Sequence, residues 1–440
     1  MSIFKGPKAR ATKFARVSAG LAADFASTKA KSLFQNTEEK AQSEQQFKRR
    51  LGNEVAQTLS EMKGPLMKVG QIFSQVKDVL PPEVSDALGQ LRQNAKPIDY
   101  AIIAETIEKE FGKSPELLFA EFDQTPYRAA SLGQVHKARL FSGEDVVVKV
   151  QYPDVKEHCL TDLKHLKRLL KILPLMGIEK KSTNAIYTEA ESVIHRELDY
   201  LLEAESAQKF YDFYQDNDQV IVPKVYPEYS TSTILTLELI QGASLISLQE
   251  LRKNNRGDDS LTRKVAENLL DCMLQQIFIF QTIHVDPHAG NFAYKPSGQI
   301  IMFDYGAVKQ LEPNIVDLFK QAVEAALVYD YAEIERLLIL RGIRRPKTKP
   351  LGEAFYKPWV ELANTPFVNE KFDFSQSNLH QQAMKLIKKD WKQNTQSFSP
   401  NGATLLLDRL IVGHYWNLVH LAVECAPGEI LKKYVNYSPH

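Results

Sequence analysis

The feature that most constrains this chain is a set of polar residues that flanks two short apolar segments between residues 284 and 306. Asp286 is followed, after four intervening residues, by Asn291, and the apolar segment Ile300–Phe303 then ends in Asp304-Tyr-Gly306. An Asp-x-Gly triplet by itself is usually a turn. The whole order, with its strand context, is that of a loop for phosphoryl transfer.

The residue types in this set suit phosphoryl transfer chemically. Asp286 would accept or orient the proton of the nucleophile, so we predict that it is catalytic. Asn291 and Asp304 offer the hard oxygen ligands that Mg²⁺ prefers, and we predict that they bind the metal. Such a site needs little covalent chemistry, because positioned charge supplies most of the rate enhancement.

A lysine lies in a run of β-branched residues, Val146-Val-Val-Lys149-Val. It is either a charge on an edge strand or a functional amine that points inward. The second alternative requires an acidic partner, and the candidates lie in a helix predicted over Ser182–Phe213. Asp199 and Glu203 are four residues apart on one face of that helix, where like charges repel. They lie either on a solvated face or beside cations in a site.

Composition excludes several classes of protein. The chain has 55 Lys+Arg against 54 Asp+Glu, so no global field attracts nucleic acid. Three scattered cysteines argue against a disulfide framework and fit a reducing compartment. The apolar stretches Cys272–Val285 and Leu410–Val423 are shorter than the ~20 residues needed to cross a bilayer, so we predict core helices and no integral membrane segment.

The N-terminus is basic, since five Lys and Arg residues between Lys5 and Arg16 precede the first acid, Asp24. Such a stretch is either a mitochondrial targeting segment, an arm on a membrane surface, or a frayed terminus that leads into a helix. We therefore expect a cytoplasmic protein, peripheral at the membrane, with the mitochondrial matrix as the alternative.

The order of predicted elements gives the fold class. Helices dominate from about Phe14 to Val79. A β-hairpin follows over Tyr127–Gln151, and two more strands over Val220–Val225 and Thr233–Ile240, with helices between. Helices then dominate to the end, apart from short strands around residues 291–303. We predict an α+β, bilobal fold with a helical extension at 1–120, an N-lobe at 121–242 and a helical C-lobe at 243–440.

Together these segments resemble the UbiB/AarF family of atypical, protein-kinase-like kinases, the group that includes the coenzyme Q biosynthesis kinase-like proteins. The matching segments occur in the family's order over about residues 60–310: Lys68–Gln71 (KxGQ), Ala129–Gln134 (alanine-rich loop), Val146–Gln151, Glu197–Ala204 (ExD followed by Glu-Ala), His284–Asn291 and Asp304–Gly306.

The resemblance implies a protein-kinase-like fold that binds ATP and Mg²⁺ between two lobes. By position it makes Lys149 a phosphate contact that pairs with Glu203, and both join Asp286 as catalytic residues. It gives regulatory roles to residues that face or cover the active site: Lys68, Gln71, Glu197 and Asp199. The residues predicted to bind the nucleotide are Ala129, Ala130, Ser131, Lys149, Glu238 and Ile240.

The resemblance also implies a function in isoprenoid quinone (ubiquinone) biosynthesis or lipid metabolism, as an atypical kinase or ATPase. Candidate partners besides ATP are quinone precursors, anionic lipids and proteins of quinone biosynthesis. ATPase activity is expected over protein phosphorylation, because Gly306–Pro346 contains no Ser or Thr and no Ala-Pro-Glu. The alternatives are a small-molecule phosphotransferase of the aminoglycoside- or choline-kinase type and a nucleotide-gated, lipid-binding scaffold.

Overall fold

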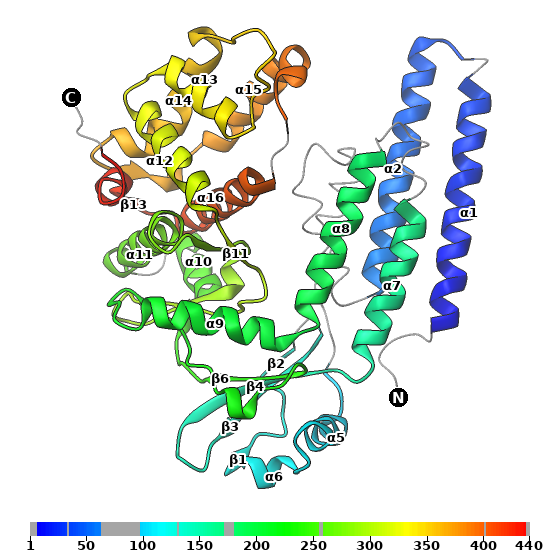
Figure 1. Cartoon of the computed structure of the whole chain (residues 1–440), viewed down its shortest axis with the longest axis vertical. Coiled ribbons are helices and arrows are strands. Elements are labelled where there is room, and N and C mark those ends of the chain that lie inside the picture. Colours follow the sequence, from blue (N-terminus) through cyan, green and yellow to red (C-terminus); the bar gives the residue numbers. More distant parts are fainter. Residues whose placement is uncertain are drawn as a thin grey trace. The chain divides into compact units, whose positions relative to one another are not determined.

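The computed structural model describes residues 7–32, 35–62, 97–129, 132–170, 180–254, 258–399 and 402–436. By its internal contacts the chain divides into two compact units (Figure 1). The first contains Met1–Glu205 and Lys224–Leu239, and the second contains Ser206–Pro223 and Ile240–His440. The three-part division drawn from the sequence stays a prediction.

The first unit holds an antiparallel sheet whose main order is β1-β3-β4-β6, with β2 paired to β3. Its strands are β1 (Glu121–Phe122), β2 (Arg128–Ala129), β3 (Gly133–Arg139), β4 (Asp145–Gln151) and β6 (Ile234–Glu238). The alternation seen in the sequence of β4 is real: Val146, Val148 and Val150 are fully buried. Because successive side chains on a strand point to opposite faces, Lys149 projects from the other face.

The buried face of this sheet packs on helix α5 (Tyr100–Phe111), which contributes the fully buried Ile103 and Ile107. Strand β3 begins at Gly133, where a Cβ atom would lie 1.9 Å from the backbone oxygen of Val150. Only glycine therefore permits the backbones of β3 and β4 to approach so closely at this end.

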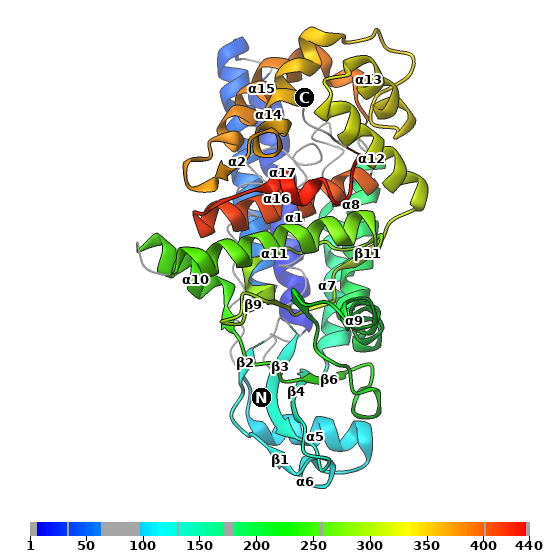
Figure 2. The same ribbon diagram turned by 90° about the vertical axis from the view of Figure 1, so that its left-hand side faces the viewer.

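The first unit also contains further helices. They are α1 (Pro7–Ser32), α2 (Thr37–Met62), α6 (Pro115–Leu118), α7 (Val155–Leu170), α8 (Lys180–Glu197) and the first part of α9 (Tyr200–Tyr214). Helix α1 packs on α2 and on α7, and α7 packs on α8 (Figures 1 and 2). Helices α1 and α2 fall in the extension predicted to be helical.

The prediction of a single helix over Ser182–Phe213 is wrong, because a turn at Leu198-Asp199 separates α8 from α9. The Asp199 Oδ1 accepts a hydrogen bond of 3.0 Å from the backbone N–H of Leu201 and so caps α9. Asp199 and Glu203 therefore do not repel each other along one helical face. Both carboxylates instead lie near the N-terminus of α9, where the helix dipole favours negative charge.

The second unit is mainly helical. Its helices are α10 (Leu245–Lys253), α11 (Asp259–Phe278), α12 (Pro313–Leu327), α13 (Tyr331–Leu340), α14 (Glu353–Val368), α15 (Leu379–Asn394), α16 (Gly402–Leu421), α17 (Pro427–Leu431) and the rest of α9. One sheet has the order β5-β10-β9-β7, formed by Val220–Ile221, Ile300–Met302, Phe292–Tyr294 and Ala243–Ser244. Two ribbons pair β8 (Thr282–His284) with β11 (Val308–Gln310) and β12 (Phe372–Asp373) with β13 (Glu424–Cys425).

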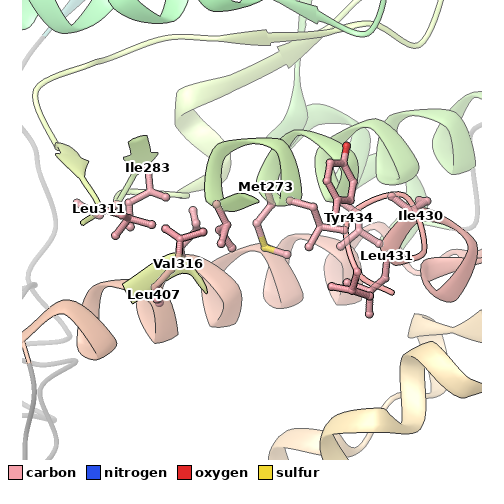
Figure 3. Close-up of a cluster of buried hydrophobic side chains, with 14 of the residues drawn as sticks. Met273, Ile283, Leu311, Val316, Leu407, Ile430, Leu431 and Tyr434 are labelled. Atoms are coloured by element: carbon pink, nitrogen blue, oxygen red, sulfur yellow. The ribbon is translucent and has the colours of Figure 1, made fainter. Parts of the chain in front are cut away.

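The main core of this unit lies between α11 and α16, with β8, α12, α17 and Leu311 around it (Figure 3). Met273 of α11 and Leu407 of α16 are among its buried members. The prediction of one core helix over Cys272–Val285 is wrong past Phe278, because β-branched residues after the helix form β8. Among the described residues, no helix combines the length and apolar character needed to cross a membrane.

Candidate active site

Lys149 and Glu203 meet in the first unit. The Lys149 ammonium nitrogen donates to both carboxylate oxygens of Glu203, at 2.9 and 2.8 Å. The side chains are 18% and 5% exposed, so the pair is largely shielded from water. Because β4 lies between β3 and β6, the edge-strand alternative for Lys149 is wrong.

The aromatic ring of Tyr200 also lies near this ammonium. Its centroid lies 4.6 Å from the Lys149 nitrogen, within cation–π distance. The backbone N–H of Tyr200 donates to the carbonyl of Ser232 at 3.0 Å, which ties the start of α9 to the segment before β6. The sequence analysis missed Tyr200, although it directly follows Asp199 in the ExD segment.

The structure also shows where the other predicted site residues of the first unit lie. Glu197 is the last residue of α8 and is buried, and Asp199 caps α9. Ala129 is exposed on β2. Glu238 ends β6, and its Oε2 accepts from the backbone N–H of Lys224 at 3.2 Å. Its predicted role stays a prediction.

Five predicted positions remain to be placed. Ile240 is half-buried and opens the second segment of the second unit. Lys68, Gln71, Ala130 and Ser131 lie outside the described residues.

In the second unit, strands β9 and β10 bring Asn291 and Asp304 to one end of an antiparallel ribbon. Phe292 pairs with Met302, and the backbone N–H of Phe303 donates to the carbonyl of Asn291 at 2.8 Å. Asn291 immediately precedes β9, and Asp304 follows Phe303. The twelve residues between them therefore form a hairpin that returns the chain to its starting point.

The backbone of Asp304 adopts a conformation that few side chains accept. Its φ is +61°, in the left-handed region, where aspartate is tolerated better than most residues. Two contacts hold it there: the Asp304 Oδ1 accepts from the N–H of Gly306 at 3.2 Å, and the His284 Nε2 lies 2.5 Å from the Asp304 carbonyl oxygen. Strained backbone of this kind often aims a functional side chain.

The donor set at this end of the ribbon fits Mg²⁺. The Nδ2 of Asn291 donates to the carbonyl of Asp286 at 2.9 Å, so the amide presents its oxygen, Oδ1, as the group for a cation. One carboxylate and one amide oxygen suit Mg²⁺, which usually takes only one or two protein carboxylates beside waters and phosphate oxygens. Within the described residues, no group of three or more His, Cys, Asp or Glu could hold a metal by itself.

Helix α16 contacts Asp286 and the residue after it, and the sequence did not predict these contacts. The Nη2 of Arg409, on α16, lies 3.5 Å from the Asp286 Oδ1. The buried Asn417 donates through Nδ2 to the carbonyl of Pro287 at 2.8 Å. Between them on the helix, Gly413 faces Pro287, where a Cβ atom would lie 2.1 Å from the proline Cγ.

The only sequence signal for these three residues is their spacing of four, which puts them on one helical face. Which segment that face would contact could not be read from the spacing.

Next to Gly413, His414 is fully buried against Phe292, with ring centroids 5.6 Å apart. Burial, and then the charge of His284, lower the pKa of His414 to about 3, so this ring is neutral at ordinary pH.

The close contact at Gly413 gives a prediction about stability. Gly413→Ala should lower the free energy of unfolding by about 1–3 kcal/mol, because the new methyl group overlaps Pro287 and must displace the loop or the helix. Urea denaturation would measure the change. Gly20→Ala is the control, since a Cβ atom there meets nothing within 4 Å. Equal stability of Gly413→Ala and wild type would mean that α16 does not pack on Pro287.

Comparison with known proteins identifies the family of this chain. A sequence model of the ABC1 atypical kinase-like domain matches residues 90–338, more than half of the chain. The chain belongs to this family. The resemblance to UbiB/AarF kinases and the kinase-like α+β fold are thereby confirmed.

Two relatives of this ABC1-family chain are named as organelle proteins. It is 35% identical over 290 residues to the chloroplastic ACTIVITY OF BC1 COMPLEX KINASE 8 of Arabidopsis thaliana, covering 64% of this chain and 38% of the relative. It is 31% identical over 331 residues to the mitochondrial atypical kinase COQ8 of Saccharomyces cerevisiae, covering 73% and 64%. The chain thus spans less than two thirds of either relative, and its own location stays a prediction.

A solved structure supports the fold alone. The Rv3197–erythromycin complex of Mycobacterium tuberculosis superposes with a TM-score of 0.63 at 23% identity, covering 86% of this chain and 93% of that one. This match extends well beyond residues 90–338. The shared architecture is therefore larger than the part of the chain that the family model matches.

Proposed function

We propose that this protein is an ATP-dependent atypical kinase or ATPase that uses Mg²⁺. The observation that carries the proposal is the shielded bidentate pair formed by Lys149, on the interior strand β4, and Glu203, on helix α9. A lysine at this place in a kinase-like sheet binds nucleotide phosphates, and its acidic partner holds the ammonium in position.

The polar residues of the second unit have complementary roles in this proposal. Asn291 and Asp304 would hold Mg²⁺, which would neutralise phosphate charge. The carboxylate of Asp286 would accept or orient the proton of the attacking hydroxyl or water. Asp286 is 24% exposed, so its carboxylate remains within reach of a nucleophile from solvent.

Support for hydrolysis over protein phosphorylation comes from the segment after Asp304. In protein kinases, a phosphorylated activation loop and an Ala-Pro-Glu motif follow the metal-binding aspartate. Here β11 and α12 occupy that segment, and it contains no Ser or Thr.

The relative COQ8 supports a place in quinone biosynthesis, so quinone-precursor-like phenols and anionic lipid vesicles are the additions to test on ATP hydrolysis.

Ligand-induced stabilisation tests the binding of ATP and metal. MgATP at 100 times its dissociation constant should stabilise the wild type by about 2.7 kcal/mol. Asp304→Asn should abolish this gain, because the metal loses its carboxylate. Thermal unfolding with and without MgATP measures both effects. Asp373→Asn is the matched control, because Asp373 also accepts from the N–H two residues ahead, at 2.8 Å. An undiminished shift in Asp304→Asn would contradict the metal role.

A further inference from the structure

Helix α16 contacts the loop of Asp286 although it lies outside residues 90–338, the part of the chain matched by the family model. Three of its residues, one turn apart, take part. Arg409 reaches the Asp286 carboxylate, Gly413 packs on Pro287, and Asn417 binds the Pro287 carbonyl. Asn417 and Gly413 contact the backbone and ring of Pro287, next to Asp286, whereas Arg409 contacts the Asp286 carboxylate itself.

The position of Arg409 on α16 is well determined by packing. Leu407 and Leu410, on either side of it in sequence, are fully buried, and Leu407 lies in the core shown in Figure 3. Arg409 and Asp286 are 17% and 24% exposed. Their attraction is therefore screened less by solvent than that of a surface pair. Packing thus fixes the helix that presents the guanidinium to the carboxylate.

Arg409 supplies a guanidinium group that the loop itself lacks. In protein kinases the corresponding loop reads His-Arg-Asp, with an arginine directly before the aspartate. Here Val285 occupies that place and is buried. The guanidinium next to Asp286 comes instead from a helix more than a hundred residues later. It needs no phosphorylation to be brought into place.

We propose that Arg409 is the positioning residue for Asp286, so that α16 is part of the catalytic machinery. The inference rests on the proposed function. One oxygen of Asp286, Oδ1, faces the guanidinium, which fixes the rotation of the carboxylate. The other oxygen is thereby directed to the nucleophile. Because small errors in the placement of a catalytic group have large effects on rate, the loss of Arg409 should lower turnover.

The test compares two arginines with nearly equal burial. Arg409→Met keeps the aliphatic stem but removes the guanidinium. Arg252→Met is the control, because Arg252 is 18% exposed and donates to the carbonyls of Leu421 and Ala422 at the other end of α16. We expect kcat for MgATP turnover to fall about tenfold to a hundredfold in Arg409→Met. Turnover should stay near wild type in Arg252→Met, and the MgATP-induced thermal shift should persist in both.

Two further measurements separate positioning from a structural role. Arg409→Lys keeps the charge and should retain more activity than Arg409→Met. In the Asp286→Asn background, Arg409→Met should have no further effect, because a residue that acts through Asp286 loses its effect when that carboxylate is gone. Multiplicative losses in the double variant, or equal losses in Arg409→Met and Arg252→Met, would overturn the inference.

The failure of this inference can be told apart from the failure of the proposed function. Wild-type protein without MgATP turnover or MgATP-induced stabilisation would remove the proposed function and the inference with it. Wild-type turnover that Asp286→Asn abolishes but Arg409→Met leaves unchanged would refute only the role of Arg409.

Discussion

Asp286→Asn is expected to lower kcat for ATP turnover by about 10²–10⁴-fold while MgATP still binds. Asparagine has nearly the same shape as aspartate and can still face Arg409, but its amide cannot accept the proton of a nucleophile. Steady-state hydrolysis would give kcat, and thermal unfolding with MgATP would report binding. The effect should therefore appear in kcat and not in the ligand-induced shift.

Asp373→Asn serves again as the control for a substitution of the same chemistry at an exposed turn. Near-normal turnover in Asp286→Asn would show that Asp286 handles no proton. Nucleotide binding without turnover in the wild type would instead point to a nucleotide-gated binding module. Activity only after addition of a soluble hydroxylated acceptor would instead favour the small-molecule phosphotransferase.

Lys149→Ala is expected to abolish MgATP-induced stabilisation and also to destabilise the protein itself. The substitution leaves the carboxylate of Glu203, only 5% exposed, without the ammonium that both its oxygens accept from. Removing one member of a shielded ion pair typically lowers the free energy of unfolding by about 3 kcal/mol or more. Urea denaturation without nucleotide would measure this loss.

The double variant Lys149→Met/Glu203→Gln separates folding from binding. With both charges removed, no unpaired charge remains buried, so much of the stability should return. Binding of MgATP should not return, because the phosphates still lack their cation. Recovery of the MgATP-induced shift in the double variant would show that Lys149 has only a structural role.

The local elements of the site could be predicted because their signals are local. The alternation of Val146, Val148 and Val150 placed Lys149 on the opposite face of its strand from the core. The spacing of Asp286, Asn291 and Asp304 matched a loop and hairpin whose backbone bonds the structure shows. The helix boundary at Asp199 was missed because the apolar pattern continues across it, while a single capping hydrogen bond decides the break.

The sequence by itself determined the residue types of the chemistry and the strand or loop that carries each one, because strand alternation and motif spacing depend only on near neighbours in the chain. Tertiary structure decided their partners. The acidic partner of Lys149 lies 54 residues later in the chain, and the arginine that contacts Asp286 lies 123 residues later. Such contacts follow from how buried faces pack, as in the core that anchors Leu407 and so places Arg409 beside Asp286.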